Sequence, residues 1–113
     1  MRRILLLLLL LAGCSKGPEA DLQYIGEARS SAAEWALVNE QASLGKLTHP
    51  YVSSMRRSLR SQIKSAKSAL TVPGSAYDAE MEALLAQPDE ASPNELRAHA
   101  ERLKQIEDEL ESA

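Results

Sequence analysis

The sequence predicts an all-α fold, a small antiparallel helical hairpin or bundle of three to four helices behind an apolar amino-terminal segment. Apolar side chains recur at three- and four-residue steps over most of the chain, which is the period of one helical face. Serine, threonine, proline and glycine stand where these segments begin and end. No segment alternates apolar and polar residues as a half-buried strand does.

The amino-terminal segment has the layout of a secretory signal peptide. Arg2 and Arg3 supply positive charge, residues 4–11 form an apolar run rich in leucine, and the small residues Ala12 and Gly13 follow. A membrane-spanning helix needs roughly 20 apolar residues, and this run has less than half of that number. We therefore expect residues 1–13 to be a cleaved leader and not a transmembrane helix.

The four residues Leu11-Ala12-Gly13-Cys14 resemble the lipobox of bacterial lipoprotein precursors. The resemblance implies that the sulfur of Cys14 receives a diacylglyceryl group, that a signal peptidase cuts before Cys14, and that the new amino terminus is acylated. The alternative is a plain secretory leader with an incidental cysteine, but Cys14 is the only cysteine and stands where the lipobox requires one. A single cysteine also excludes an internal disulfide framework or a multi-cysteine metal site.

The lipid implies a location for the protein, anchored to a membrane of the cell envelope. Each buried CH₂ group contributes about 0.8 kcal/mol, and two or more acyl chains hold a protein stably on a membrane. Residues 14–20 are then the lipidated cysteine and a short linker, and no cofactor is expected besides this covalent lipid. In enterobacterial lipoproteins an aspartate after the cysteine marks inner-membrane retention, so Ser15 favours the outer membrane, facing the periplasm, in a Gram-negative cell.

A helical domain is expected over residues 21–113, and its first helix over 21–44. The apolar face of this helix is formed by Leu22, Ile25, Ala28, Ala32, Trp35, Val38 and Ala42. Gly45 suits the C′ position that closes a helix, and Thr48 can cap the next one. Because the connection is so short, the first two helices should form an antiparallel hairpin.

The second helix, expected over 49–70, carries unbalanced positive charge beside its apolar stripe. Its cations are Arg56, Arg57, Arg60, Lys64 and Lys67. Residues 41–77 contain no acid, so no neighbour at i±4 relieves these charges. We expect the cations to pair mainly with the acidic third and fourth helices. Contact with a partner protein or with an anionic surface is the alternative.

Two shorter acidic segments complete the domain. Residues 72–74 (Val-Pro-Gly) break the second helix, and a third helix is expected over 75–87. Ser92, Pro93 and Glu95 form a strong start signal for the last helix, whose leucines repeat every seven residues in a coiled-coil-like seam. Acids crowd the carboxyl end of that helix, where the macrodipole disfavours them, so this end should either fray or meet cations.

Few residues are candidates for chemistry, and we do not expect an enzyme. His99 lies on the seam of the last helix, where a half-buried histidine with one hydrogen bond is expected, and His49 should be a capping or surface residue. Neither histidine has a closely spaced companion ligand for a metal. Trp35 is either a partner-facing anchor or the filling of a thin core. Removal of the leader changes the net charge from −3 to −5, which argues against a general nucleic-acid binder.

These observations favour a small membrane-anchored bacterial envelope lipoprotein that acts as a helical interaction or structural module. The expected partner is an envelope protein or a second copy of the chain, with no nucleic acid and no small-molecule substrate. Two alternatives remain open: an exclusion or inhibitor lipoprotein of a plasmid or phage, and an electrostatic binder of anionic lipid or cell-wall polymer through helix 49–70.

A second resemblance covers roughly twenty-five residues. Residues 44–48 (Leu-Gly-Lys-Leu-Thr) with Tyr51 are similar to the short helical-hairpin domain called SHOCT, which has a glycine, an aliphatic-threonine turn and an aromatic residue soon after. The acidic pair that follows the threonine in that domain is His49-Pro50 here, and the aromatic comes one residue early. We interpret the likeness as a shared way to build a hairpin.

Overall fold

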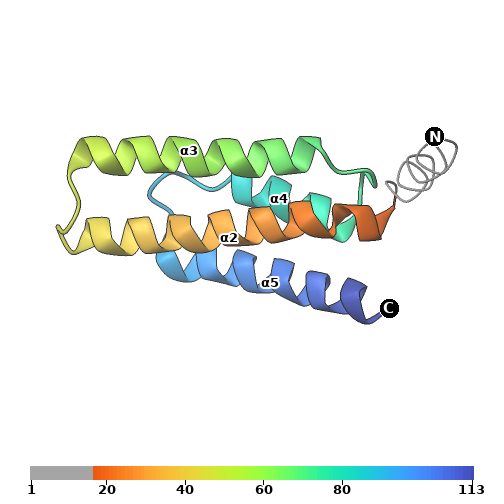
Figure 1. Cartoon of the computed structure of the whole chain (residues 1–113). Coiled ribbons are helices and arrows are strands. Elements are labelled where there is room, and N and C mark those ends of the chain that lie inside the picture. Colours follow the sequence, from red (N-terminus) through yellow and green to blue (C-terminus); the bar gives the residue numbers. More distant parts are fainter. Residues whose placement is uncertain (1–16) are drawn as a thin grey trace, which may run out of the picture.

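The computed structural model describes residues 17–113, and this part of the chain is a bundle of four helices without strands. The helices, labelled as in Figure 1, are α2 (Pro18–Ser43), α3 (His49–Ser68), α4 (Ala76–Leu85) and α5 (Pro93–Ser112). The prediction of an all-α bundle is therefore confirmed. The predicted leader, the lipobox with Cys14 and the first part of the linker lie outside the described residues. Within 17–113, no helix combines the length and the apolar character needed to cross a membrane.

The helix α2 is the centre of the bundle. It packs against α3, α4 and α5, whereas α3 and α5 do not contact each other. The helices α2 and α3 form the predicted antiparallel hairpin, and α5 runs back along another side of α2 (Figure 1). The turn of this hairpin projects beyond α4 and α5, while the start of α2 and the end of α5 lie at the opposite end (Figure 1).

The helices begin and end at the residues whose local chemistry favours a boundary. Gly45 has a φ of 69° after the last turn of α2, and the N–H groups of Gly45 and Lys46 donate to the carbonyls of residues 42 and 41, the Schellman arrangement. The hydroxyls of Thr48 and Ser92 accept hydrogen bonds from the third N–H of α3 and of α5. These three predictions are confirmed.

The first helix begins three residues earlier than predicted. Pro18 occupies its first turn, where a proline is tolerated because the missing N–H has no partner in the helix. Asp21, the predicted helix start, therefore lies inside the helix, and its side chain is fully buried.

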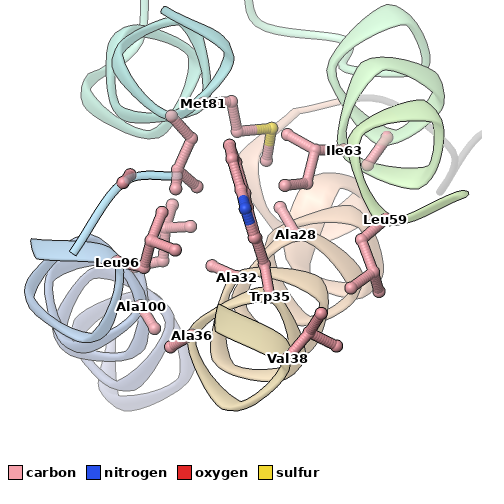
Figure 2. Close-up of a cluster of buried hydrophobic side chains, with 14 of the residues drawn as sticks. Ala28, Ala32, Trp35, Ala36, Val38, Leu59, Ile63, Met81, Leu96 and Ala100 are labelled. Atoms are coloured by element: carbon pink, nitrogen blue, oxygen red, sulfur yellow. The ribbon is translucent and has the colours of Figure 1, made fainter. Parts of the chain in front are cut away.

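The core is thin and is organised around the indole of Trp35. Figure 2 shows this ring between Ile63 of α3 and Leu96 of α5, with Met81 of α4 at its upper end, and all four side chains are fully buried. The alanines of α2 that face the other helices are also fully buried, namely Ala28, Ala32 and Ala36. Small side chains let neighbouring helices approach α2 closely, so one tryptophan fills much of the remaining space.

The close packing of α5 on α2 is clearest at Gly26. A Cβ atom at this position would lie 3.0 Å from Oε2 of Glu107, so the glycine makes room for that carboxylate. The other oxygen of Glu107 accepts a hydrogen bond of 2.9 Å from Nε of Arg29. Of the two outcomes predicted for the acidic end of α5, the structure shows the one in which an acid meets a cation.

Candidate functional site

The cations of α3 lie along one flank of the helix, and the structure divides them by how far they are already neutralised. Lys67 is neutralised within the bundle, because its Nζ lies 3.2 Å from an oxygen of Asp78 and 3.2 Å from an oxygen of Glu82. Hydrogen bonds from the ammonium group to Glu82 and Asp78 raise the pKa of Lys67. Both acids belong to α4, so the predicted pairing of the second helix with the third is confirmed at this residue.

The predicted pairing of the second helix with the fourth is wrong. No ion pair joins α3 to α5 among residues 17–113, because α2 and α4 lie between them. The acids of α5 meet other cations: Glu107 binds Arg29 of α2, and Asp108 binds Lys104 at 3.1 Å. The two helices do run in the same direction, but a shared direction does not bring their side chains together.

Arg60 is held against the core by Trp35 and by the loop after α4. Its guanidinium carbon lies 5.0 Å from the centre of the indole ring, within the range of a cation–π contact. Its two terminal nitrogens donate to the carbonyls of Gln87 and Leu85 at 2.7 and 2.8 Å. The indole N–H donates to the carbonyl of Asp89 at 3.0 Å. Trp35 has no exposed surface, so the structure places it in the core and gives it no partner-facing side.

Asn39, which the sequence analysis did not single out, positions Arg56. Its side-chain N–H₂ group donates to the carbonyls of Asp89 and Ala91 at 3.0 and 2.8 Å, and its oxygen accepts from Nε of Arg56 at 2.9 Å. Asn39 is only 5% exposed. A sequence signal for this role existed, because the asparagine lies one turn after Trp35 on the predicted buried face, and a buried amide needs partners.

A cavity of about 350 Å³ opens where the first three turns of α3 meet the loop after α4. We call it the arginine cavity, and it is lined by His49, Ser53, Arg56, Arg57, Arg60, Asp89 and Glu90. Three guanidinium groups face two carboxylates, so positive charge is in excess. Guanidinium groups bind carboxylates and phosphates through paired hydrogen bonds, and an anionic group is therefore the ligand that this cavity suits.

Arg57 is the least engaged of the three arginines. It is exposed, and no carboxylate of residues 17–113 lies within 4.0 Å of its side chain or of that of Arg56. By contrast, Nε of Arg60 lies 3.6 Å from Asp89, in addition to its two carbonyl partners. Lys64 is exposed as well, but it lies farther along α3 and does not line the arginine cavity. The free binding capacity of the arginine cavity therefore resides mainly in Arg56 and Arg57.

His99 has more partners than the single hydrogen bond that the sequence predicts. Its Nδ1 lies 2.5 Å from an oxygen of Glu80, which also binds Nε of Arg102 at 2.8 Å. The other ring nitrogen lies 3.2 Å from the side-chain amide of Gln87. His99 is 8% exposed, and this cluster joins α5 to α4. Both ring nitrogens are occupied by structural contacts.

Asp21 closes the end of the bundle at which the chain enters α2. Its carboxylate accepts hydrogen bonds from the backbone N–H and the hydroxyl of Thr71, from the N–H of Val72 and from the phenol of Tyr77, at 2.7–3.2 Å. Burial alone would raise the pKa of Asp21, but these hydrogen bonds outweigh burial and lower it. Burial, and then the hydrogen bond to Asp21, raise the pKa of Tyr77 to about 12.

The same end of the bundle fixes the backbone of Gly17. Its N–H donates to the hydroxyl of Thr71 at 3.0 Å, and that hydroxyl lies 3.1 Å from the carbonyl of Gly17. We call this end, defined by Gly17, Asp21 and Thr71, the proximal end, because the chain enters α2 here. The hairpin tip, residues 44–51, lies at the other end of α2. Two of its large apolar side chains are exposed, Leu44 by 60% and Tyr51 by 49%.

One group of acids has the spacing of possible metal ligands. Oxygens of Glu107, Asp108 and Glu111 lie within 4.8 Å of one another at the end of α5. Two of these acids are already paired with Arg29 and Lys104, so the group has the character of a solvated acidic surface. Within the described chain, neither histidine belongs to such a group.

Comparisons of the chain with protein-family models, with curated proteins and with solved structures find no match.

Proposed function

We propose that this chain is a lipid-anchored bacterial envelope module that binds a partner protein through the end of its bundle farthest from the membrane. The lipobox at Leu11-Ala12-Gly13-Cys14 supports the anchor. Cys14 precedes Gly17 by three residues, a distance that an extended chain spans in roughly 10 Å. A lipid on Cys14 therefore keeps the proximal end next to the bilayer.

The observation that carries the proposal is that Gly17 and the hairpin tip lie at opposite ends of α2. A helix of 26 residues is about 39 Å long, so the hairpin tip stands about that far from Gly17 along the bundle. The arginine cavity and the exposed side chains of Leu44 and Tyr51 belong to the distant end. Exposed apolar side chains at the same end of a bundle as arginines without ion pairs are typical of protein–protein contact surfaces.

The same opposition argues against the lipid-binding alternative. The least neutralised arginines, Arg56 and Arg57, lie in the first turns of α3, next to the hairpin tip. With the bundle upright on its proximal end, these arginines lie away from the bilayer that carries the anchor. Attraction to anionic head groups falls off within about 10 Å, so that bilayer is a poor target for these arginines.

A first experiment tests the anchor. Replacement of Cys14 by serine should move the protein from the membrane fraction to the soluble fraction, while the helical circular dichroism spectrum and the melting temperature stay unchanged. The substituted residue precedes α2 in the sequence, which explains the second expectation. A Cys14→Ser protein that still floats with membranes would show that the anchor is elsewhere.

A second experiment tests the direction of binding. A photo-crosslinking amino acid is placed in intact cells at Tyr51 of the hairpin tip or, as a matched control, at the exposed Glu19 near the proximal end. We expect a discrete crosslinked product at Tyr51 and none at Glu19, with the partner identified by mass spectrometry. Products at Glu19 alone would reject the proposal. A product made of two copies of this chain would identify the partner as the chain itself.

A further inference from the structure

We propose that the arginine cavity receives an acidic segment of the partner protein and that Arg56 and Arg57 bind its carboxylate. This inference rests on the proposed function and names the chemistry by which the partner is recognised. The cavity volume of about 350 Å³ suits one or two side chains, so the ligand is a short stretch of peptide and not a folded domain.

Arg56 is arranged in advance for this contact. Asn39 binds Nε of Arg56 and is itself fixed by two backbone carbonyls, so the arginine is held before any ligand arrives. No contact to a described residue occupies the terminal nitrogens of Arg56, and these nitrogens can donate to a carboxylate. An arginine that is already ordered loses less side-chain entropy on binding than a free one.

Arg60 strengthens the site without acting as its hydrogen-bond donor. Its terminal nitrogens are used by the carbonyls of Leu85 and Gln87, and its flat face lies on Trp35. A ligand does not need to displace these contacts. The fixed positive charge remains in the wall of the cavity, where it adds to the attraction for an anion.

The carboxylates of the cavity determine which anion fits. Asp89 and Glu90 line it together with the arginines, and Asp89 lies 3.6 Å from Nε of Arg60, so a densely charged group such as a phosphate polymer would meet two carboxylates as well as the guanidinium groups. A peptide separates its charges by several ångströms and can place one carboxylate on Arg56 and Arg57 while a neutral or basic residue passes Glu90. The mixed charges of the cavity therefore favour an acidic peptide segment.

A binding assay with the full lipoprotein in non-ionic detergent tests this inference. The probes are a fluorescently labelled peptide of alternating glutamate and glycine and the same peptide with glutamine in place of glutamate. Fluorescence anisotropy should rise with the glutamate peptide and stay unchanged with the glutamine peptide. Binding of both peptides alike would overturn the inference.

Variants then locate the binding site. Arg57→Gln should weaken binding of the glutamate peptide roughly tenfold, and Arg56→Gln by a similar factor. Lys46→Gln removes an exposed cation of the hairpin tip that does not line the cavity, and its affinity should stay within about twofold. Arg57 makes no ion pair, so its replacement leaves the fold intact, and an unchanged melting temperature verifies this. Equal losses in Lys46→Gln and Arg57→Gln would overturn the inference.

Two competitors separate acidic peptide from other anions. Inorganic phosphate and free glutamate are compared as competitors at equal concentrations of negative charge. If phosphate displaces the peptide as well as glutamate does, the cavity is a simple anion site and the proposal is overturned. If the peptide does not bind, but phosphatidylglycerol vesicles bind the protein and this binding depends on Arg57, the ligand is a lipid surface and the proposal is overturned as well.

Crosslinking in cells keeps this inference separate from the proposed function. If the wild-type protein gives its product at Tyr51 and the Arg56→Gln, Arg57→Gln double variant loses that product, both stand. If the double variant keeps the product, the cavity is not the recognition site, although the proposed function stands. If the wild-type protein gives no product, the proposed function fails.

Discussion

Replacement of Asp21 by asparagine should destabilise the bundle by about 2–4 kcal/mol. The buried carboxylate accepts four hydrogen bonds, two at each oxygen, from donors on residues 71, 72 and 77. Asparagine keeps one oxygen and turns an N–H₂ group toward the other two donors, so at least one of the four donors loses its acceptor. Each hydrogen bond to a charged group contributes about 1.5–3 kcal/mol, and relief of the buried charge offsets part of the loss of two.

The assay is unfolding in urea and by heat, followed by circular dichroism. For a domain of this size 1 kcal/mol corresponds to roughly 4–8 °C, so the melting temperature should fall by roughly 10–30 °C. Glu19→Gln is the matched control, because it removes the same charge from the same helix turn at an exposed position. An Asp21→Asn protein that melts within 2–3 °C of Glu19→Gln, roughly half the shift that 1 kcal/mol produces, would refute the reasoning.

Acid provides a second test of the same carboxylate. The pKa of Asp21 is lowered in the folded protein, so its contribution to stability is present above the ordinary pKa of 3.8 and is lost as the pH falls through the folded value. The stability of the wild-type protein should therefore drop below about pH 4, and part of this drop should be missing in Asp21→Asn. Equal pH dependence in the two proteins would show that the carboxylate is not the cause.

Three further predictions concern Tyr77, the exposed ion pairs and Trp35. Tyr77→Phe should remove the step near pH 12 from the absorbance titration at 295 nm, and an unchanged titration would contradict the assignment. Because the raised pKa favours the neutral phenol in the folded state, the stability that Tyr77 contributes should be complete below pH 10 and disappear between pH 10 and about 12. Raising NaCl from about 0.05 to 0.5 M should lower the melting temperature by a few degrees, because salt screens exposed ion pairs such as that of Arg97 with Glu40. A constant melting temperature would count against a net contribution of these pairs to the stability of the fold. Trp35→Phe should lower the free energy of unfolding by about 1–3 kcal/mol, because the variant loses the hydrogen bond to Asp89 and leaves part of the core unfilled. The urea midpoint measures this loss, and an unchanged midpoint would contradict the role given to the indole.

Three helix boundaries followed from the sequence because their causes are local. The caps at Thr48 and Ser92 and the turn at Gly45 each depend on residues within a few positions, and all three occur as predicted. The antiparallel hairpin followed for the same reason, since a short connection leaves the second helix little choice of direction.

The partners of individual charges did not follow, because they come from distant and irregular segments. Asp21 was expected to begin a helix, yet three of its four donors belong to Thr71 and Val72, about fifty residues away in the loop after α3. The partners of Arg60 are carbonyl groups near Gln87, which no side-chain pattern reveals. The expected pairing between the second and fourth helices failed because α2 takes the central position, and no periodicity of the sequence specifies which helix is central.

That central position has a consequence for how the chain is made. The helix α2 is the first of the described helices to be synthesised, yet its contacts with α5 wait for residues 93–112, the last of these helices to leave the ribosome. The hairpin of α2 and α3 can form early, because its contacts are close in sequence. Until α5 is synthesised, the small apolar face around Ala32 and Ala36 stays exposed to water. A chain truncated before Leu96 therefore exposes an apolar surface to which the α5 of another copy can bind.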